Sequence, residues 1–164
     1  MPAPVDVSDD LVTFLRANLN TERVSVPFDP ADDIDHANYE GSQEYPQIAV
    51  VSEDAIVAGG GLTQYSGIDP GGGGGIQDVV VSLLVDCWGG PEDEAVYRST
   101  GVHPDRVAAE LAHEVHQAAT ATGASSPPPG YDWLSAEPPR DADDVDREQT
   151  HYRQQVICRL KYIN

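Results

Sequence analysis

Few residues in this 164-residue sequence have the types and spacing that chemistry needs, and the first candidate is the run of five glycines at 71–75. A phosphate-binding loop has the pattern Gly-x-x-x-x-Gly-Lys-Ser/Thr and opens a helix, and a dinucleotide-binding loop opens a helix as well. Here the run is followed by Ile76, Gln77 and Asp78, without a lysine, and by the pattern of a strand. Asp69 would also repel a phosphate. We therefore interpret the run as a flexible loop between two strands.

A second candidate is the stretch HEVH, in which His113 and His116 lie three residues apart and could reach one metal ion from the same side of a helix. The zinc peptidase motif His-Glu-x-x-His instead places its histidines four residues apart around a glutamate. Because no third ligand is indicated, a solvated helix face is the better interpretation. The pattern predicts no metal site and no other cofactor.

The two cysteines, Cys87 and Cys158, both fall within apolar strand patterns, which is typical of buried thiols. A disulfide between them stays open at this point, because it requires the two strands to be neighbours. Neither cysteine has the neighbours of a catalytic nucleophile, the pattern Gly-x-Ser-x-Gly does not occur, and no pair of carboxylates stands out as an acid–base couple. We therefore expect that the protein is not an enzyme.

Charge is the strongest feature of the composition. The sequence has 28 Asp and Glu against 9 Lys and Arg, a formal net charge of -19, and Lys161 is its only lysine. Such a surface repels itself in dilute buffer, whereas in molar salt the Debye length falls to about 3 Å and the repulsion is screened. The composition therefore indicates adaptation to a salt-rich cytoplasm, as in halophilic archaea and their viruses. It also argues against a broad nucleic-acid-binding surface, which would be basic.

Against this acidic background, four of the nine cations lie in the last eighteen residues: Arg147, Arg153, Arg159 and Lys161. The last three share one face of a predicted strand, because they are separated by even numbers of residues. We consider three interpretations of this group: salt bridges to the acidic loops of the same chain, a subunit contact in which the basic strand of one copy meets an acidic loop of the next, and a wall of a channel that DNA traverses.

The elements that must position these residues follow from hydrophobic periodicity. Helices are predicted from Ser8, as N-cap, to Leu19, and from Pro104 to a stop at Gly123. Strands are predicted at 45–52, 62–65, 76–88, 131–136 and 150–163, with a possible short edge strand at 23–28. The segment 76–88 is apolar on nearly every residue, which favours a central strand covered on both faces.

This order predicts one α+β domain over residues 1–164, with a mostly antiparallel sheet and two helices packed on one face. We expect flexible insertions at about 29–44, which is acidic and polar, and at 66–75, which contains the glycines. No apolar stretch is long enough to span a membrane. The first ten residues lack a basic segment followed by an apolar one, so we also expect no secretory signal.

The whole-chain pattern resembles the tail terminator (tail completion) proteins of long-tailed viruses. The resemblance rests on an opening helix, a strand at YPQIAV, a valine-rich strand ending in tryptophan (VVVSLLVDCWG), an alanine-rich helix (RVAAELAHEVHQAA), an acidic loop and the long closing strand THYRQQVICRLKYI. It covers most of the chain, but it depends on the order of the segments and on their residue pattern, without an invariant motif.

The resemblance implies a non-catalytic virion protein that forms a ring, typically a homohexamer, at the end of the tail tube. Its implied partners are other copies of itself, the tail tube protein, the head–tail connector or stopper, and genomic DNA that passes through the lumen without sequence-specific contact. It implies assembly in the host cytoplasm and a final place in the neck of the virion. Two alternatives remain: another neck component, such as a stopper or head-completion ring, and a halophilic enzyme or metal-binding protein that uses His113 and His116.

Overall fold

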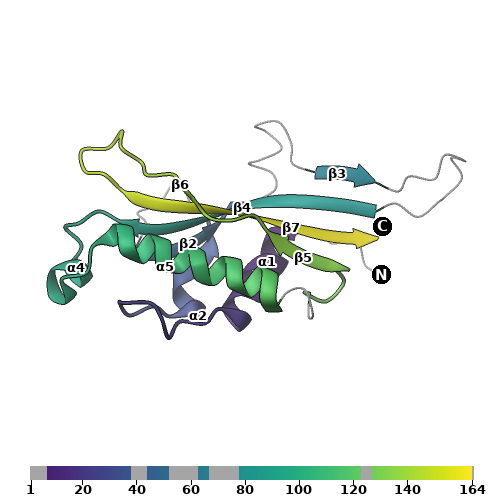
Figure 1. The fold of residues 1–164 in the computed structure, drawn as a ribbon, viewed down its shortest axis with the longest axis horizontal. Helices are drawn as coiled ribbons and strands as arrows, with labels where there is room; N and C mark the ends of the chain where they lie inside the picture. Colours follow the sequence, from purple (N-terminus) through teal and green to yellow (C-terminus); the bar gives the residue numbers. More distant parts are fainter. Residues whose placement is uncertain (1–6, 38–43, 52–62, 67–77, 123–126, 164) are drawn as a thin grey trace, which may run out of the picture.

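Two long strands form the centre of the sheet: β4 (Asp78–Gly90) and β7 (Tyr152–Ile163) (Figure 1). The structure is a computed structural model that describes residues 7–37, 44–51, 63–66, 78–122 and 127–163. The two strands pair antiparallel from Asp78 opposite Ile163 to Gly90 opposite Tyr152, with a bulge between Trp88 and Gly90. The sequence predicts both strands, 76–88 from its nearly continuous apolar residues and 150–163 from its alternating residues. Among the described helices, both main ones lie on a single face of the sheet, so no helix covers β4 on its other face.

Shorter strands extend the sheet on both sides of this central pair. β2 (Gln47–Val50) and β3 (Thr63–Ser66) both pair antiparallel with β4, while β5 (Trp133–Ala136) and β6 (Arg140–Asp141) both pair antiparallel with β7. Only β1 (Ile34–His36) adds a parallel pair, with β2, among the described strands. The sheet is therefore mostly antiparallel, as the sequence predicts.

The two predicted helices, α1 (Val7–Asn18) and α5 (Pro104–Gln117), cover one face of this sheet (Figure 1). His103 caps α5 by accepting a hydrogen bond from the Asp105 backbone N–H on its Nδ1, at 3.2 Å, and Pro104 takes the first helical position. The predicted stop at Gly123 lies outside the described residues. α5 continues instead into a π-helical turn, η1 (Ala118–Thr122).

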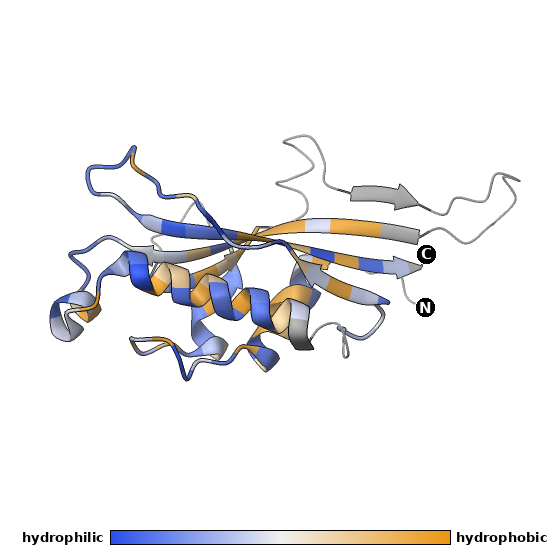
Figure 2. Ribbon diagram, in the orientation of Figure 1, coloured by the Kyte–Doolittle hydropathy of each residue, from blue (hydrophilic) through white to orange (hydrophobic). Residues whose placement is uncertain are grey.

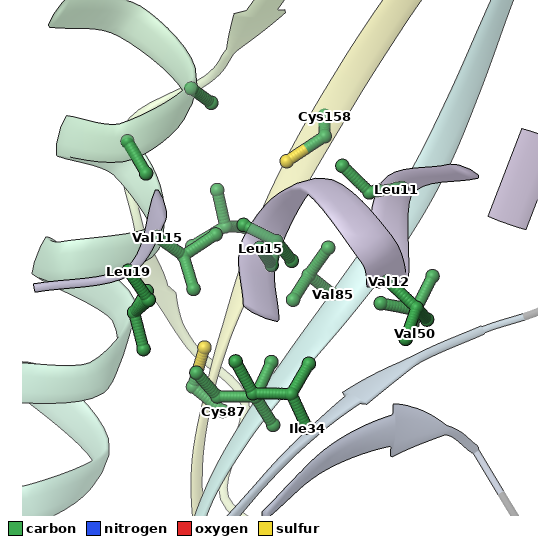
Figure 3. Close-up of a cluster of buried hydrophobic side chains, with 14 of the residues drawn as sticks. Leu11, Val12, Leu15, Leu19, Ile34, Val50, Val85, Cys87, Val115 and Cys158 are labelled. Atoms are coloured by element: carbon green, nitrogen blue, oxygen red, sulfur yellow. The ribbon is translucent and has the colours of Figure 1, made fainter. Parts of the chain in front are cut away.

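One hydrophobic core fills the space between the helices and the sheet (Figures 2 and 3). Core side chains of β4 and β7 alternate along each strand, and they meet the apolar sides of α1 and α5: Leu11, Leu15, Val81, Leu83, Val85, Leu111, Val115, Val156 and Leu160. Burying one such side chain contributes about 1.5–3 kcal/mol. The chain is therefore a single α+β domain with two main helices on one face, which confirms the expected fold class.

Three local expectations are corrected by the structure. Residues 29–44 are not simply an acidic loop, because a short helix, α2 (Pro30–Asp33), and β1 lie within them, and the Asp29 side chain caps α2. Residues 23–28 form no strand, since the backbone N–H and Oγ of Ser25 both donate to the Glu110 carboxylate of α5. Ser8 is not the N-cap, because α1 begins at Val7. In the predicted loop at 66–75, Ser66 ends β3 and the others lie outside the described residues.

A short helix that the sequence pattern misses, α4 (Ala95–Thr100), connects β4 to α5. It ends at Gly101, whose positive φ of 72° is the left-handed conformation that glycine adopts readily. Its Tyr97 is buried, and the Tyr97 hydroxyl donates a hydrogen bond to the carbonyl of Gly89. α4 therefore fastens the end of β4 to the start of the helical layer.

Candidate functional site

The sheet face away from the helices carries three of the four predicted cations. Arg153 lies opposite Trp88, Arg159 opposite Ser82, and Lys161 opposite Val80 in the register of β7 with β4. Because the core residues of β7 occupy the alternate positions, these cations share the other face, as predicted. Arg147 lies in the loop that joins β6 to β7.

Arg153 is the centre of a largely buried polar cluster on this face. Its Nη1 lies 3.5 Å from Asp86 Oδ2, its Nε donates to the carbonyl of Ala142 at 2.7 Å, and its guanidinium carbon lies 4.6 Å from the ring centroid of Trp88. Gln155 completes the cluster by donating from Nε2 to Asp86 Oδ1 at 2.8 Å. Asp86 is only 2% exposed, so these two partners hold a carboxylate that the strand removes from water.

Burial dominates the ionisation of Asp86. Desolvation raises the pKa of this carboxyl above its usual value, and the Gln155 hydrogen bond and the nearby Arg153 charge lower it by less. The net direction shows that the ion pair does not fully compensate for the loss of water. Asp86 therefore tends to hold its proton more strongly in the folded chain than in the unfolded chain.

Arg147 fastens the β6–β7 loop, residues 142–151, to the same cluster. Its Nε donates to Asp144 Oδ2 at 2.8 Å, its Nη1 donates to the Tyr45 hydroxyl at 3.4 Å, and its guanidinium carbon lies 5.6 Å from the Trp88 ring centroid. The Tyr45 ring in turn contacts the rings of Trp88 and His151, at centroid distances of 6.1 and 5.5 Å. Trp88 thus has an aromatic ring and two guanidinium groups around it.

Arg159 and Lys161 lie nearer the other end of β7. Arg159 Nη2 pairs with Glu137 Oε1 at 3.2 Å, and both side chains are partly exposed, so this pair contributes little to stability. Lys161 lies between Val80 of β4 and Trp133 of β5 in the strand register. The four cations therefore form two groups: Arg147 and Arg153 around Trp88, and Arg159 and Lys161 farther along the strand. The interpretation as salt bridges to acidic loops of the same chain is confirmed for Arg147 and Arg159, whose partners Asp144 and Glu137 lie in loops. Arg153 pairs instead with Asp86 of β4.

Three residues of this site were not predicted as site residues: Tyr45, Asp86 and Trp88. A sequence signal did exist for Asp86, since an aspartate within an apolar strand of thirteen residues needs a partner when buried. Tyr45 gives no such signal, because its role depends on β2 placing it beside Trp88. Cross-strand contacts of this kind depend on register, which the sequence of one strand does not specify.

The other candidate chemistries are not assembled among the described residues. His113 is exposed and His116 half-buried, and no group of three potential metal ligands is found in this part of the chain. Cys87 and Cys158 are free and buried, and burial raises the pKa of both thiols, that of Cys158 to about 12. Their strands are neighbours, but Cys158 lies opposite Leu83 and Cys87 opposite Gln154. The four-residue offset corresponds to about 13 Å along the strand, too far for a disulfide.

Comparison with known proteins gives no further assignment: no protein-family model matches the chain, and no curated protein is significantly similar to it. Within the ranges that the structure describes, no helix is long and apolar enough to cross a membrane.

Proposed function

We propose that this protein is a structural component of a tailed virion, a tail terminator that forms a homohexameric ring. The ring ends the tail tube, presents a surface to the head–tail connector, and lets genomic DNA pass through its lumen without sequence-specific contact. The acidic, lysine-poor composition favours a virus of a halophilic archaeon, assembled in the host cytoplasm.

The observation that carries this proposal is the pairing of β4 with β7 along almost their whole length, with both main helices on one face. These two strands and the helix between them, α5, are three of the segments on which the resemblance to tail terminators rests. The structure brings them together in one sheet and leaves a second face that carries Arg153, Arg159 and Lys161. A long sheet with a mixed polar and apolar face is suited to contacts between subunits.

Reversing the charge of Arg159 and Lys161 together, by Arg159→Glu and Lys161→Glu, tests whether this face contributes to the ring. We expect the variant to leave purified tail tubes uncapped at concentrations where the native chain caps one end, because a subunit contact would meet like charge. Electron microscopy of tubes mixed with each protein measures the capped fraction.

The matched control is Glu137→Gln, which removes the intrachain partner of Arg159 without reversing the patch. This control should cap tubes as well as the native chain does, since a partly exposed ion pair is worth about 0–1 kcal/mol. Circular dichroism measures the monomer fold of the double variant. If the fold and the capping were lost together, the two cations would have an intrachain role. Native protein that never caps a tube would contradict the terminator function itself.

A further inference from the structure

The β6–β7 loop presents one apolar side chain to solvent. Val145 is 67% exposed, and among the described residues it is the one large hydrophobic side chain that is exposed. A single exposed valine is common on protein surfaces and indicates nothing alone. The loop around it is mostly hydrophilic and extends from one end of the sheet (Figures 1 and 2).

The loop is held in place by contacts on both sides of Val145. The backbones of Asp144 and His151 exchange two hydrogen bonds of 2.9 Å, Arg147 bonds Asp144 and Tyr45, and Gln149 donates to Asp93 at 3.0 Å. A segment that is ordered before binding loses less conformational entropy when it binds. Val145 is therefore an apolar side chain on a preorganised and acidic support, with Asp146 and Glu148 exposed beside it.

A surface with the complementary chemistry lies on the outer face of the sheet, toward the other end of β7. Cross-strand neighbours there combine two cations with half-buried apolar side chains: Val80, Leu84, Trp133, Ile157, Arg159 and Lys161. We call these six residues the sheet patch. Arg159 keeps donors for a second carboxylate while it pairs with Glu137, because a guanidinium has five N–H groups.

We propose that the β6–β7 loop of one copy docks on the sheet patch of the next copy, with Val145 over the apolar residues and Asp146 and Glu148 beside Arg159 and Lys161. This inference rests on the proposed ring and names its subunit contact. The loop and the C-terminal end of β7 lie at opposite ends of the long axis (Figure 1). If the loop of that next copy docks on a third copy in the same way, the contact is heterologous, and it generates a ring when its rotation closes.

Charge identifies a second copy as the occupant. Copies with a net charge of -19 repel one another over most of their surfaces. The proposed contact places Asp146 and Glu148 of the loop beside Arg159 and Lys161. At short range, this pairing of opposite charges attracts and offsets the repulsion between the copies. The same chain supplies both halves of the complementary pair, so no other partner is required.

Disulfide trapping tests the contact directly. A chain with Val145→Cys and Ser135→Cys carries one thiol in the loop and one beside Arg159 on the outer face of β5. The native thiols are fully buried and do not compete. In molar KCl with mild oxidant we expect an intermolecular ladder that ends in a closed ring, seen by non-reducing electrophoresis. The matched control keeps Val145→Cys and carries Ser99→Cys, on the exposed side of α4, in place of Ser135→Cys. It should run as a single chain on the same gel, because no disulfide links its copies.

Assembly of single variants separates this contact from the ring itself. Val145→Asp should raise the protein concentration needed for ring formation at least tenfold. It should leave the circular dichroism spectrum of the monomer unchanged, since the side chain is exposed. Val145→Leu should assemble like the native chain. Native rings without a ladder, or rings of Val145→Asp at native concentrations, would overturn the contact while the ring stands. Native protein that forms neither rings nor a ladder would overturn the proposed function as well.

Discussion

Replacing Gly89 by alanine is expected to lower the stability of the folded chain strongly. An ideal Cβ at this position would lie 2.0 Å from the carbonyl oxygen of Pro104 and 2.8 Å from its carbonyl carbon. Both atoms belong to the backbone of the first turn of α5, so neither can rotate away as a side chain would. We expect a loss of more than about 4 kcal/mol in the free energy of unfolding, in the range that strong overpacking reaches. Urea unfolding in molar KCl measures it.

A matched control for this substitution is Gly101→Ala. Gly101 has a positive φ of 72°, but a Cβ there would meet nothing within 4 Å. Its cost is therefore that of the left-handed backbone conformation alone, about 1–2 kcal/mol. Gly89→Ala should be clearly less stable than Gly101→Ala. If both variants were equally stable, the close approach of β4 to the start of α5 would be wrong.

The second large effect is expected at Arg153. Arg153→Met leaves Asp86 as a buried carboxylate with Gln155 as its remaining described partner, and breaking a buried pair in this way costs about 3–5 kcal/mol. Asp86→Asn combined with Arg153→Met should recover most of the loss, because the buried charge is then absent. Urea unfolding of the two single variants and the double variant measures the coupling between the two side chains.

The loss in Arg153→Met should depend on pH, with a sign that follows from the raised pKa of Asp86. Between the unfolded pKa of about 3.8 and the higher folded pKa, the native state binds the proton and the unfolded state does not. The contribution of Asp86 to stability is thus greatest at low pH and falls as pH rises through this window. Removing Arg153 extends the window upward, so Arg153→Met should lose more stability at pH 7 than near pH 4. An equal loss at both pH values would indicate lost packing on Trp88 instead.

The sequence predicts the framework of this fold well because its long elements have strong periodicity. The pattern at 76–88 and 150–163 predicts both central strands and their inward faces, and the predicted helix has Pro104 at its first position and Asp105 in its first turn. Short elements are predicted less well. α2 has only four residues, too few for a periodic pattern, while β1 depends on its pairing with β2 and α4 on the contact of Tyr97 with Gly89. Residues 23–28 form no strand because Glu110 accepts the hydrogen bonds of Ser25.

The candidate site was predicted only in part. Even spacing correctly places Arg153, Arg159 and Lys161 on one face of β7, since this follows from the period of a strand alone. The division of the four cations into two groups was not predicted. It depends on which residues of β4, β5 and the β6–β7 loop face each cation, and that is a property of register and loop path.

The mass of the native chain, measured by light scattering after size exclusion, is the most direct test of the proposed ring. In about 2–3 M KCl, where the repulsion between acidic surfaces is screened, we expect a species of about six chain masses. On dilution into low salt, the same sample should dissociate. A monomer at every protein concentration in molar KCl would show that the chain alone forms no such ring.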